Sequence, residues 1–329
     1  MTMKVAVVAS HPIQYQAPMF RALANKASVH VYFAHRQSAQ QQAAAGYGVA
    51  FDWDVDVTSG YQSSFLQNRS SRPGVDTFRG ADTPGIADEL RRFEPDALLC
   101  MGWNLKCYWQ AASVARELGV PAMVRGDSQL GSPRAGWLRV AKRATYPLIL
   151  RRFDRFLPVG VRSREYLLHY GVAPSRCFVC PHTVDLDRFI TTSSFAPTER
   201  AELRRDLGVA AGDLVVAFAG RFVKWKRPVQ VIQAVAGLPN RDRVVCAFIG
   251  SGEQEAAIRR EASEAGVRIA MTGFVNQGEM PRTLALADLL VLPSNARETW
   301  GLVANESLAS GTPIVLSDEA GCAPDLSVS

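Results

Sequence analysis

Short β-rich apolar runs alternate with longer segments of helical periodicity along almost the whole chain, and this alternation most constrains the fold. In the first half, the runs that predict strands are residues 4–9, 29–34, 96–101, 122–125 and 155–159, and the segments that predict helices are residues 17–25, 83–93, 105–118 and 135–150. Strands separated by helices of this length are typical of βαβ units, in which parallel strands share one sheet.

A polar stretch at residues 191–197 interrupts this alternation and is typical of an interdomain linker. The alternation then restarts, with predicted strands at 214–219, 244–249, 268–272, 289–292 and 313–316 and predicted helices at 228–236, 253–265, 278–287 and 302–310. We therefore predict an α/β protein with two Rossmann-like domains, residues 1–190 and 191–329, that face a cleft.

Composition and charge narrow the function classes. The chain has 329 residues and 47% hydrophobic content, which is enough to fill two cores without disulfide or metal staples. Its formal net charge of +6 fits a phosphate-bearing ligand, an acidic membrane surface or nucleic acid. No recognised DNA- or RNA-binding pattern is present, so we expect no nucleic-acid partner.

The cysteines and the N-terminus indicate a cytoplasmic protein. The six cysteines are scattered and are expected to be reduced, buried thiols. Cys177 and Cys180, with His182 nearby, lack the second ligand pair that a structural zinc site needs, so we predict no metal there. Residues 1–10 become polar too early for a signal peptide, and no apolar run is long enough to span a membrane.

Two of the loops that follow predicted strands contain candidate ligand-binding residues. Gly220, Arg221 and Lys226 follow the strand at 214–219, and fixed cations in such a loop could stabilise a leaving diphosphate without a metal. Gly250 and Gly252 follow the next strand and would let the backbone approach a ligand closely. A solvated basic loop and an ordinary turn are the alternatives.

Two carboxylates near the C-terminus form the most informative motif. Glu298 lies in a loop, and Glu306 lies further along the apolar helix that Trp300, Gly301 and Leu302 open. The first N–H groups of that helix could face a phosphate, while Glu306 could accept from the adjacent hydroxyls of a ribose. The arrangement favours a nucleotide-sugar ligand. Two solvent-facing helix glutamates are the alternative.

These residues together resemble the retaining glycosyltransferases of the GT-B fold, in the large family four group. The residues that match are Gly220, Arg221, Lys226, Gly250, Gly252, Gly273, Phe274, Pro293, Ser294, Glu298, Glu306, Gly311, Pro313 and 317–321, with 156–160, 171–172, 184–185 and Phe189 upstream. The resemblance implies that Arg221 and Lys226 hold the diphosphate, and that Glu298 holds the sugar. It further implies that Glu306 holds the ribose, that residues 273–275, including Phe274 and Val275, lie near the base, and that no metal or other cofactor is needed.

The N-terminal half departs from the family pattern in the loops at residues 10–18 and 125–129. Together with residues 102–104, these loops follow predicted strands and are expected to bind a carbohydrate or lipid-linked acceptor. The candidate acceptor residues are His11, Gln14, Trp103, Arg125 and Asp127. Helix capping is the alternative for Asp127. The chain also ends earlier than the family usually does, so the second domain is expected to be C-terminally truncated.

A metal-binding D-x-D motif at Asp54 and Asp56 would be a rival chemistry. With Asp52, these residues alternate as on a solvated strand face, so we discount a metal site there. The basic amphipathic stretch at 137–155 could lie on the inner membrane face or simply pack on its domain. We predict a glycosyltransferase that moves a sugar from a nucleotide-sugar donor to an acceptor with retention of configuration, in cell-surface polysaccharide or glycolipid assembly. The alternatives are a truncated, inactive nucleotide-sugar-binding protein and another GT-B enzyme such as a nucleotide-sugar epimerase, against which the Glu298 and Glu306 pair argues.

Overall fold

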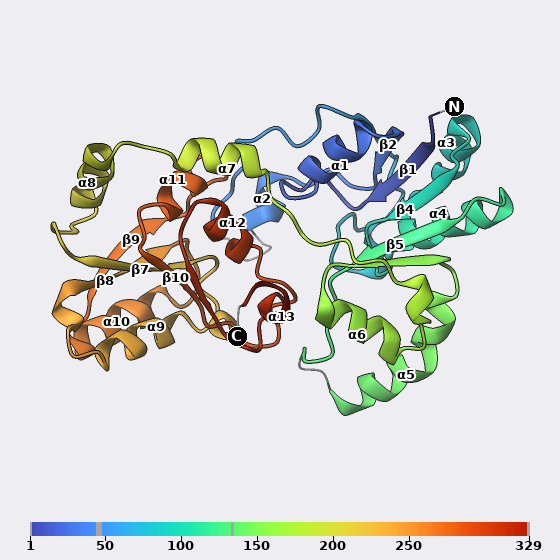
Figure 1. Cartoon of the computed structure of the whole chain (residues 1–329). Coiled ribbons are helices and arrows are strands. Elements are labelled where there is room, and N and C mark those ends of the chain that lie inside the picture. Colours follow the sequence, from blue (N-terminus) through green and yellow to red (C-terminus); the bar gives the residue numbers. More distant parts are fainter. Residues whose placement is uncertain (1, 44–47, 133–134, 328–329) are drawn as a thin grey trace. The chain divides into compact units, whose positions relative to one another are not determined.

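The computed structural model describes residues 2–43, 48–132 and 135–327 (Figure 1). Its contacts divide the chain into two compact units. The first unit comprises Met1–Gln37 and Asp56–His182, and the second comprises Ser38–Val55 and Thr183–Ser329. Each unit has its own sheet and its own hydrophobic core. Across the described residues, no helix is both long and apolar enough to cross a membrane.

The first unit is built on a parallel six-stranded sheet of order β3-β2-β1-β4-β5-β6. Its strands are β1 (Lys4–Ala9), β2 (Ser28–Phe33), β3 (Gln62–Phe65), β4 (Ala97–Cys100), β5 (Ala122–Gly126) and β6 (Arg155–Pro158). Its helices are α1 (Ala17–Ala24), α3 (Ile86–Phe93), α4 (Lys106–Glu117), α5 (Gly136–Leu150) and α6 (Val161–His169), with short 3-10 turns η2 (Phe78–Gly80) and η3 (Pro174–Arg176). Five of the six residues of β1 are buried, as expected for a strand that is covered on both faces.

The second unit contains a parallel five-stranded sheet of order β11-β10-β7-β8-β9. Its strands are β7 (Leu214–Ala219), β8 (Val244–Ile249), β9 (Arg268–Gly273), β10 (Leu289–Leu292) and β11 (Ile314–Leu316). Its helices are α2 (Ala39–Gln42), α7 (Leu186–Ser193), α8 (Pro197–Asp206), α9 (Pro228–Ala236), α10 (Glu255–Ala265), α11 (Met280–Leu284), α12 (Val303–Ala309) and α13 (Ala323–Leu326), with turns η4 (Lys224–Lys226) and η5 (Arg241–Arg243).

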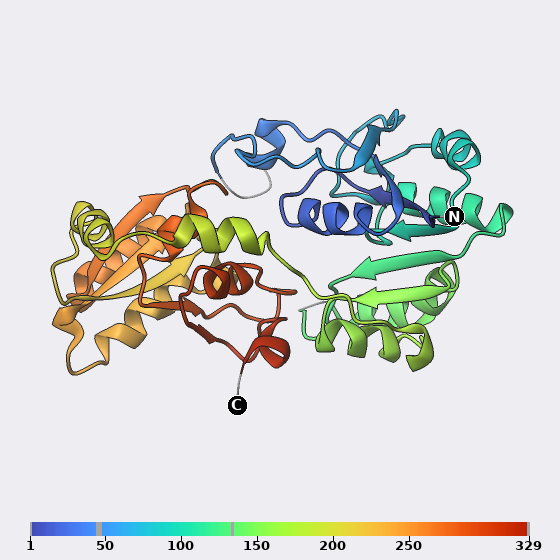
Figure 2. The same ribbon diagram turned by 45° about the horizontal axis from the view of Figure 1, so that its top comes forward.

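Two helical layers cover the sheet of the second unit. Helices α9 and α10 pack on one face, where Ile232 and Ile258 join Phe218 and Phe248 in the core. Helices α7, α11 and α12 pack together on the other face, as Figure 2 shows. Because the carboxyl ends of β7, β8 and β9 are adjacent, the loops that follow these strands gather at one edge of the sheet.

The boundary between the units lies before the predicted linker, because residues 191–193 complete α7 and Pro197 begins α8. Residues 38–55, which precede β3 in the chain, belong to the second unit rather than the first. Three contacts hold this 38–55 segment there. The Phe51 ring lies 4.5 Å from that of Phe274, Asn276 Nδ2 donates to Asp52 O at 2.8 Å, and Gly278 N donates to Asp54 Oδ1 at 2.9 Å.

Asp52, Asp54 and Asp56 do not form the strand face that their alternation predicts. Residues 51–57 contain no strand, so that prediction is wrong. Asp56 instead accepts hydrogen bonds from the backbone N–H groups of Thr58 and Ser59, both at 3.0 Å, in a tight turn. Local hydrogen bonding of this kind is the usual competitor of a strand at aspartate.

Candidate functional site

Lys226 and Glu298 form a buried ion pair in the second unit. Lys226 closes the turn after β7, and its Nζ donates to Glu298 Oε2 at 2.6 Å. The side chains are only 11% and 12% exposed. Ser294, which is fully buried, donates through Oγ to the same carboxylate oxygen at 3.1 Å. The structure therefore brings together two residues that the sequence assigns to different parts of one ligand.

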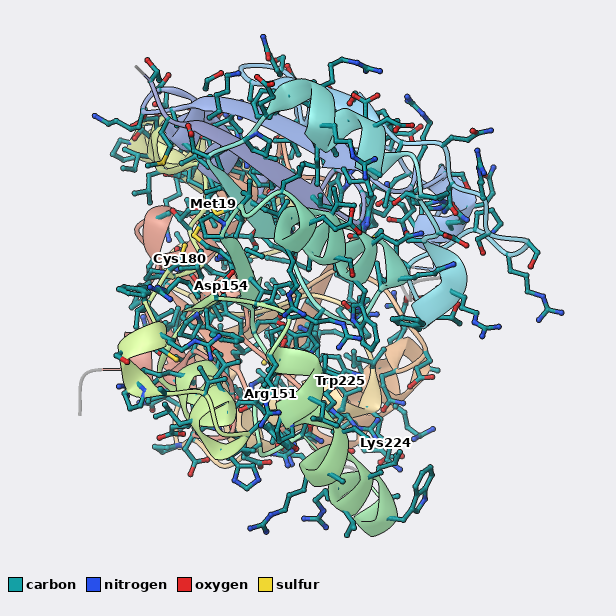
Figure 3. The ribbon with its side chains drawn as sticks, turned by 90° about the vertical axis from the view of Figure 1, so that its right-hand side faces the viewer. Met19, Arg151, Asp154, Cys180, Lys224 and Trp225 are labelled. Carbon is teal, nitrogen blue, oxygen red and sulfur yellow. The ribbon has the colours of Figure 1, made fainter. Side chains whose placement is uncertain are left out.

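The indole of Trp225, which the sequence pattern did not single out, lies close to two cations of this loop. The guanidinium carbon of Arg221 is 5.9 Å from the centre of the Trp225 ring, and Lys226 Nζ is 5.1 Å from it. Lys224 and Trp225 lie next to each other on the η4 turn (Figure 3). Cations above an aromatic face are stabilised by its quadrupole, so Trp225 helps to hold the basic loop in place.

Gly250 and Gly252 are explained first by packing of the protein backbone. A Cβ atom on Gly250 would lie 2.1 Å from Gly220 O, and one on Gly252 would lie 2.7 Å from Phe222 O. Phe222 N also donates to Ser251 O at 2.7 Å. The two glycines thus let the loops that follow β7 and β8 pack against each other, which brings Arg221 to the edge of the sheet.

Glu306 is buried and linked to two residues that no local motif predicts. Only 6% of Glu306 is exposed, and its Oε1 accepts from Gln277 Nε2 at 3.1 Å. Arg188 Nη2 in turn donates to Gln277 Oε1 at 3.2 Å. Burial raises the pKa of the Glu306 carboxyl. The hydrogen bond from Gln277 and the positive charges of Arg188 and Lys226 oppose this rise.

The residues around the start of α12 mostly fill the core. Trp300 is 5% exposed and donates through Nε1 to Asn305 Oδ1 at 2.7 Å. Gly301 has a φ of +97°, and a Cβ atom there would lie 2.6 Å from Leu292 Cδ2. Leu302 packs against the core of the same unit. This segment is built tightly enough to fix where Glu298 and Glu306 lie.

The two residues expected near a base lie beyond the end of β9. Phe274 packs against Phe51 of the 38–55 segment with the two rings tilted by 37°, and Val275 packs against the core. Phe51 is not among the predicted site residues, because nothing in its local sequence indicates that it contacts Phe274, which lies far later in the chain.

In the first unit, Arg125 lies at the end of β5 in a buried polar cluster. Its Nη2 donates to Pro181 O at 3.1 Å and lies 3.3 Å from His182 Nδ1. Arg125 is 5% exposed, and its buried Nε has no hydrogen-bond partner within the described residues. The His182 ring meets Tyr15 edge-on at 5.2 Å. Burial, with a smaller contribution from Arg125, lowers the pKa of His182 to about 3, so this imidazole is neutral.

The other predicted acceptor residues follow β1, β4 and β5 in the same unit. His11 Nδ1 lies 3.0 Å from Ser10 Oγ, and burial, followed by the charge of His35, lowers the pKa of His11 to about 4. Gln14 has a buried Oε1 that no described residue pairs. Trp103 is 8% exposed, and a Cβ atom on Gly126 would lie 2.4 Å from its ring. Asp127 is partly buried in the loop that follows β5.

The basic stretch at 137–155 forms α5 and the turn into β6. Apolar side chains on α5 remain in solvent, with Trp137 70%, Val140 72% and Leu148 58% exposed. Arg151 lies at the end of this helix (Figure 3). The cysteines are free thiols, and no three His, Cys, Asp or Glu side chains come together as metal ligands within the described parts of the chain.

Comparison with known proteins identifies the family of the second unit. The model of the glycosyl transferases group 1 family matches residues 199–327, which include Lys226, Glu298 and Glu306. Residues 199–327 belong to this family. A D-inositol 3-phosphate glycosyltransferase of Corynebacterium aurimucosum is 35% identical over 271 residues, which cover 76% of this chain and 62% of that protein. The chain spans about a third to three fifths of the length of the curated glycosyltransferases it matches.

Solved structures agree on the fold over nearly the whole chain. Anabaena HepE in complex with UDP and glucose has a TM-score of 0.69 at 16% identity, covering 99% of this chain and 83% of that one. A glycosyltransferase from Rickettsia africae has a TM-score of 0.73 at 12% identity, covering 99% and 82%. The chain therefore has the GT-B fold of two Rossmann-like units.

Proposed function

We propose that the protein transfers a sugar from a nucleotide-sugar to an acceptor with retention of anomeric configuration. The observation that carries this proposal is the pair Glu298 and Glu306. Glu298 contacts Lys226 in the loop after β7, and Glu306 is buried beside helices α7 and α11. The family match of residues 199–327 and the UDP-glucose bound by HepE support the same donor class.

The donor would be held by groups of complementary chemistry. Lys226 uses one of its three N–H groups for Glu298, which leaves two for phosphate oxygens. Arg221 adds a guanidinium fork that can bind a diphosphate. Glu298 would accept from sugar hydroxyls, Glu306 from the ribose, and Phe274 and Val275 would flank the base. The backbone at Gly220, Gly250, Gly252, Trp300, Gly301 and Leu302 would shape the site.

In this proposal the charge of the leaving diphosphate is stabilised by side chains, without a metal or another cofactor. As the glycosidic bond breaks, negative charge grows on the diphosphate, which Lys226 and Arg221 would face. The departing phosphate takes the proton of the acceptor hydroxyl on the face from which it leaves, and the acceptor oxygen bonds to the anomeric carbon. No protein nucleophile is needed.

The acceptor is proposed to be a carbohydrate or a lipid-linked sugar that binds at the first unit, in cell-surface polysaccharide or glycolipid assembly. The buried Arg125 Nε and Gln14 Oε1 are a donor and an acceptor for which no described residue supplies a partner. A ligand with hydroxyls and an anionic group could satisfy both. The curated relatives act on D-inositol 3-phosphate, and this ligand has both kinds of group.

Donor screening followed by a transfer assay tests this function. A thermal-shift panel of UDP-, GDP-, ADP- and dTDP-sugars should show one nucleotide that raises the melting temperature. With that donor, Lys226→Ala should lower turnover by about 10²–10³. Lys224→Ala is the matched control, since Lys224 lies exposed on the same turn. Intact turnover in Lys226→Ala would contradict the diphosphate assignment. A protein that binds the donor but transfers no sugar would be an inactive nucleotide-sugar-binding protein. Inversion of one stereocentre of the donor sugar in the absence of an acceptor would indicate an epimerase.

We also propose that α5 rests on the anionic cytoplasmic face of a membrane. Trp137 and Val140 are more than two-thirds exposed on a helix that also carries Arg139, Lys142 and Arg143, and such helices bind anionic interfaces. Vesicle pelleting with and without phosphatidylglycerol tests this, with the double variant Trp137→Ser/Val140→Ser. Pelleting that does not depend on anionic lipid, or that the variant retains, would contradict the contact.

A further inference from the structure

Gln277 lies between a cation and a carboxylate that do not touch each other. Arg188, on α7, donates to both the backbone and the side-chain oxygen of Gln277, the latter at 3.2 Å. Gln277 Nε2 then donates to Glu306 Oε1 at 3.1 Å. Among the described residues, Arg188 and Glu306 form no direct ion pair, and Gln277 connects them.

The chemistry of the three groups fixes the direction of the Gln277 amide. A guanidinium has only donors, so the amide oxygen must face Arg188. The amide N–H₂ must therefore face Glu306, which as a carboxylate only accepts. Because Gln277 is 7% exposed, water competes little for these bonds. The result is a fixed donor aimed at one oxygen of Glu306, while Oε2 of Glu306 has no hydrogen bond to the described residues.

The loop that carries Gln277 is fastened from its other side by the 38–55 segment. Gly278 N donates to Asp54 Oδ1 at 2.9 Å, and Asn276 Nδ2 donates to Asp52 O at 2.8 Å. The backbone of Gly278 lies so close that a Cβ atom there would be 2.8 Å from Asp54 Oδ2. The residues on both sides of Gln277 are thus tied to a segment more than two hundred positions earlier in the chain.

We propose that Gln277 is a positioning residue for Glu306, held by Arg188 on one side and by the 38–55 segment on the other. It occupies one oxygen of Glu306 and turns the second toward the ribose diol of the donor. The inference rests on the proposed function, because it assigns a ribose to Glu306. It adds that residues 51–54, which come before most of the first unit in the chain but belong to the second, help to set the geometry of the ribose subsite.

Nucleotide binding measured with and without the ribose diol tests this directly. UDP, GDP and ADP are titrated calorimetrically into the whole chain, and the one that binds is compared with its 2′,3′-dideoxy form. The wild-type protein should bind the ribonucleotide more tightly. Gln277→Leu should weaken the ribonucleotide by about 10- to 100-fold, the range for a lost hydrogen bond to a charged group. Its affinity for the dideoxy form should stay unchanged.

A matched control comes from the same unit. Gln233 Nε2 donates to Glu261 Oε1 at 2.9 Å on the exposed surface, so Gln233→Leu removes the same kind of bond away from the site. It should leave both affinities unchanged. If Gln277→Leu weakens the affinity for the ribonucleotide and for its dideoxy form equally, the site has collapsed and the proposal is overturned. An unchanged affinity for the ribonucleotide would also overturn it. If the wild-type protein binds none of these three nucleotides and no dTDP, the proposed function fails and this inference falls with it. Binding of dTDP alone would overturn only this inference, because dTDP lacks the 2′-hydroxyl of the diol.

Two further readouts separate positioning from bulk stability. Asp54→Ala removes the acceptor for Gly278 N and should weaken the ribonucleotide by about 3- to 10-fold, whereas Asp54→Asn retains an acceptor oxygen and should stay within about twofold of wild type. Ribonucleotide binding should also fail at acid pH as Glu306 protonates. The charged groups that face Glu306 are Arg188 and Lys226. Gln277→Leu should move this acid limit to higher pH, and an unmoved limit would contradict positioning.

Discussion

The buried contact between Lys226 and Glu298 predicts that neither charge can be removed alone without a large loss of stability. Their atoms are 2.6 Å apart, and the side chains are 11% and 12% exposed. Removing one partner of a buried pair typically costs about 3–5 kcal/mol, because the other charge stays desolvated. Ser294 still donates to Glu298, and a tenth of each side chain reaches solvent, so we expect about 3 kcal/mol for Lys226→Met.

Urea unfolding followed by tryptophan fluorescence measures this loss, since Trp225 and Trp300 both lie in the second unit. A double-mutant cycle of Lys226→Met with Glu298→Leu should show a coupling of about 2–3 kcal/mol, because the double variant leaves no buried charge unpaired. Lys224→Met is the control and should lie within about 0.5 kcal/mol of wild type. If each single variant loses much less than about 3 kcal/mol and the two losses simply add in the double variant, Lys226 and Glu298 do not form a buried ion pair.

Three further predictions concern single groups. Glu306→Gln should make the second unit more stable near pH 7. Burial raises the pKa of the Glu306 carboxyl, so the wild-type protein loses stability as the pH rises through that pKa, whereas the glutamine variant does not. The urea midpoints of the two proteins should therefore become equal at acid pH, where Glu306 is protonated. Gly252→Ala should cost more than about 2 kcal/mol in urea unfolding, since its Cβ would meet Phe222 O at 2.7 Å, whereas Gly266→Ala has open space and should cost only about 1 kcal/mol of φ strain. His182 has its pKa lowered from 6.5 to about 3, so the first unit should lose stability as pH falls from about 6.5, and His182→Gln should flatten that loss.

The regular elements followed closely from local sequence pattern. The strands predicted at 4–9, 214–219, 244–249 and 289–292 are β1, β7, β8 and β10. Apolar runs of this length, bounded by polar turns, carry most of their structural information locally. Strand β3 was missed, because Gln62-Ser-Ser-Phe65 has no apolar run and becomes a strand only by pairing with β2 at the sheet edge.

The path of residues 38–55 could not be predicted, because contacts between distant residues decide it. Nothing local to Phe51 or Asp54 indicates that they meet Phe274 and Gly278. The composition of 191–197 suggested a linker there, yet part of that stretch completes α7. A polar stretch indicates that the residues are exposed to solvent. The exposed end of a helix and a loop are both polar, so composition does not distinguish them.

Local pattern offered candidate site residues but not the contacts that they make. Lys226 and Glu298 were proposed because they follow predicted strands, Glu306 because it lies along the next helix, and all three lie in the second unit. Gln277 and Arg188, which are linked to Glu306, were missed. Hydrogen bonds between residues so far apart in the chain produce no characteristic spacing in the sequence. The helix expected to open at Trp300 and Gly301 begins later, because α12 starts at Val303, and the Trp300 ring is buried.

The buried charges of the second unit are costly to remove from water. Apolar side chains of similar volume often replace a buried ion pair without loss of stability, and burial already disfavours the charged form of Glu306. Stability alone therefore gives no reason for Lys226, Glu298 and Glu306 to lie where they do. A ligand does, because charges fixed in a poorly solvated site interact strongly with a charge brought to them. A phosphate for the remaining N–H groups of Lys226 and a diol for the second oxygen of Glu306 would complete the set, and a nucleotide-sugar supplies both.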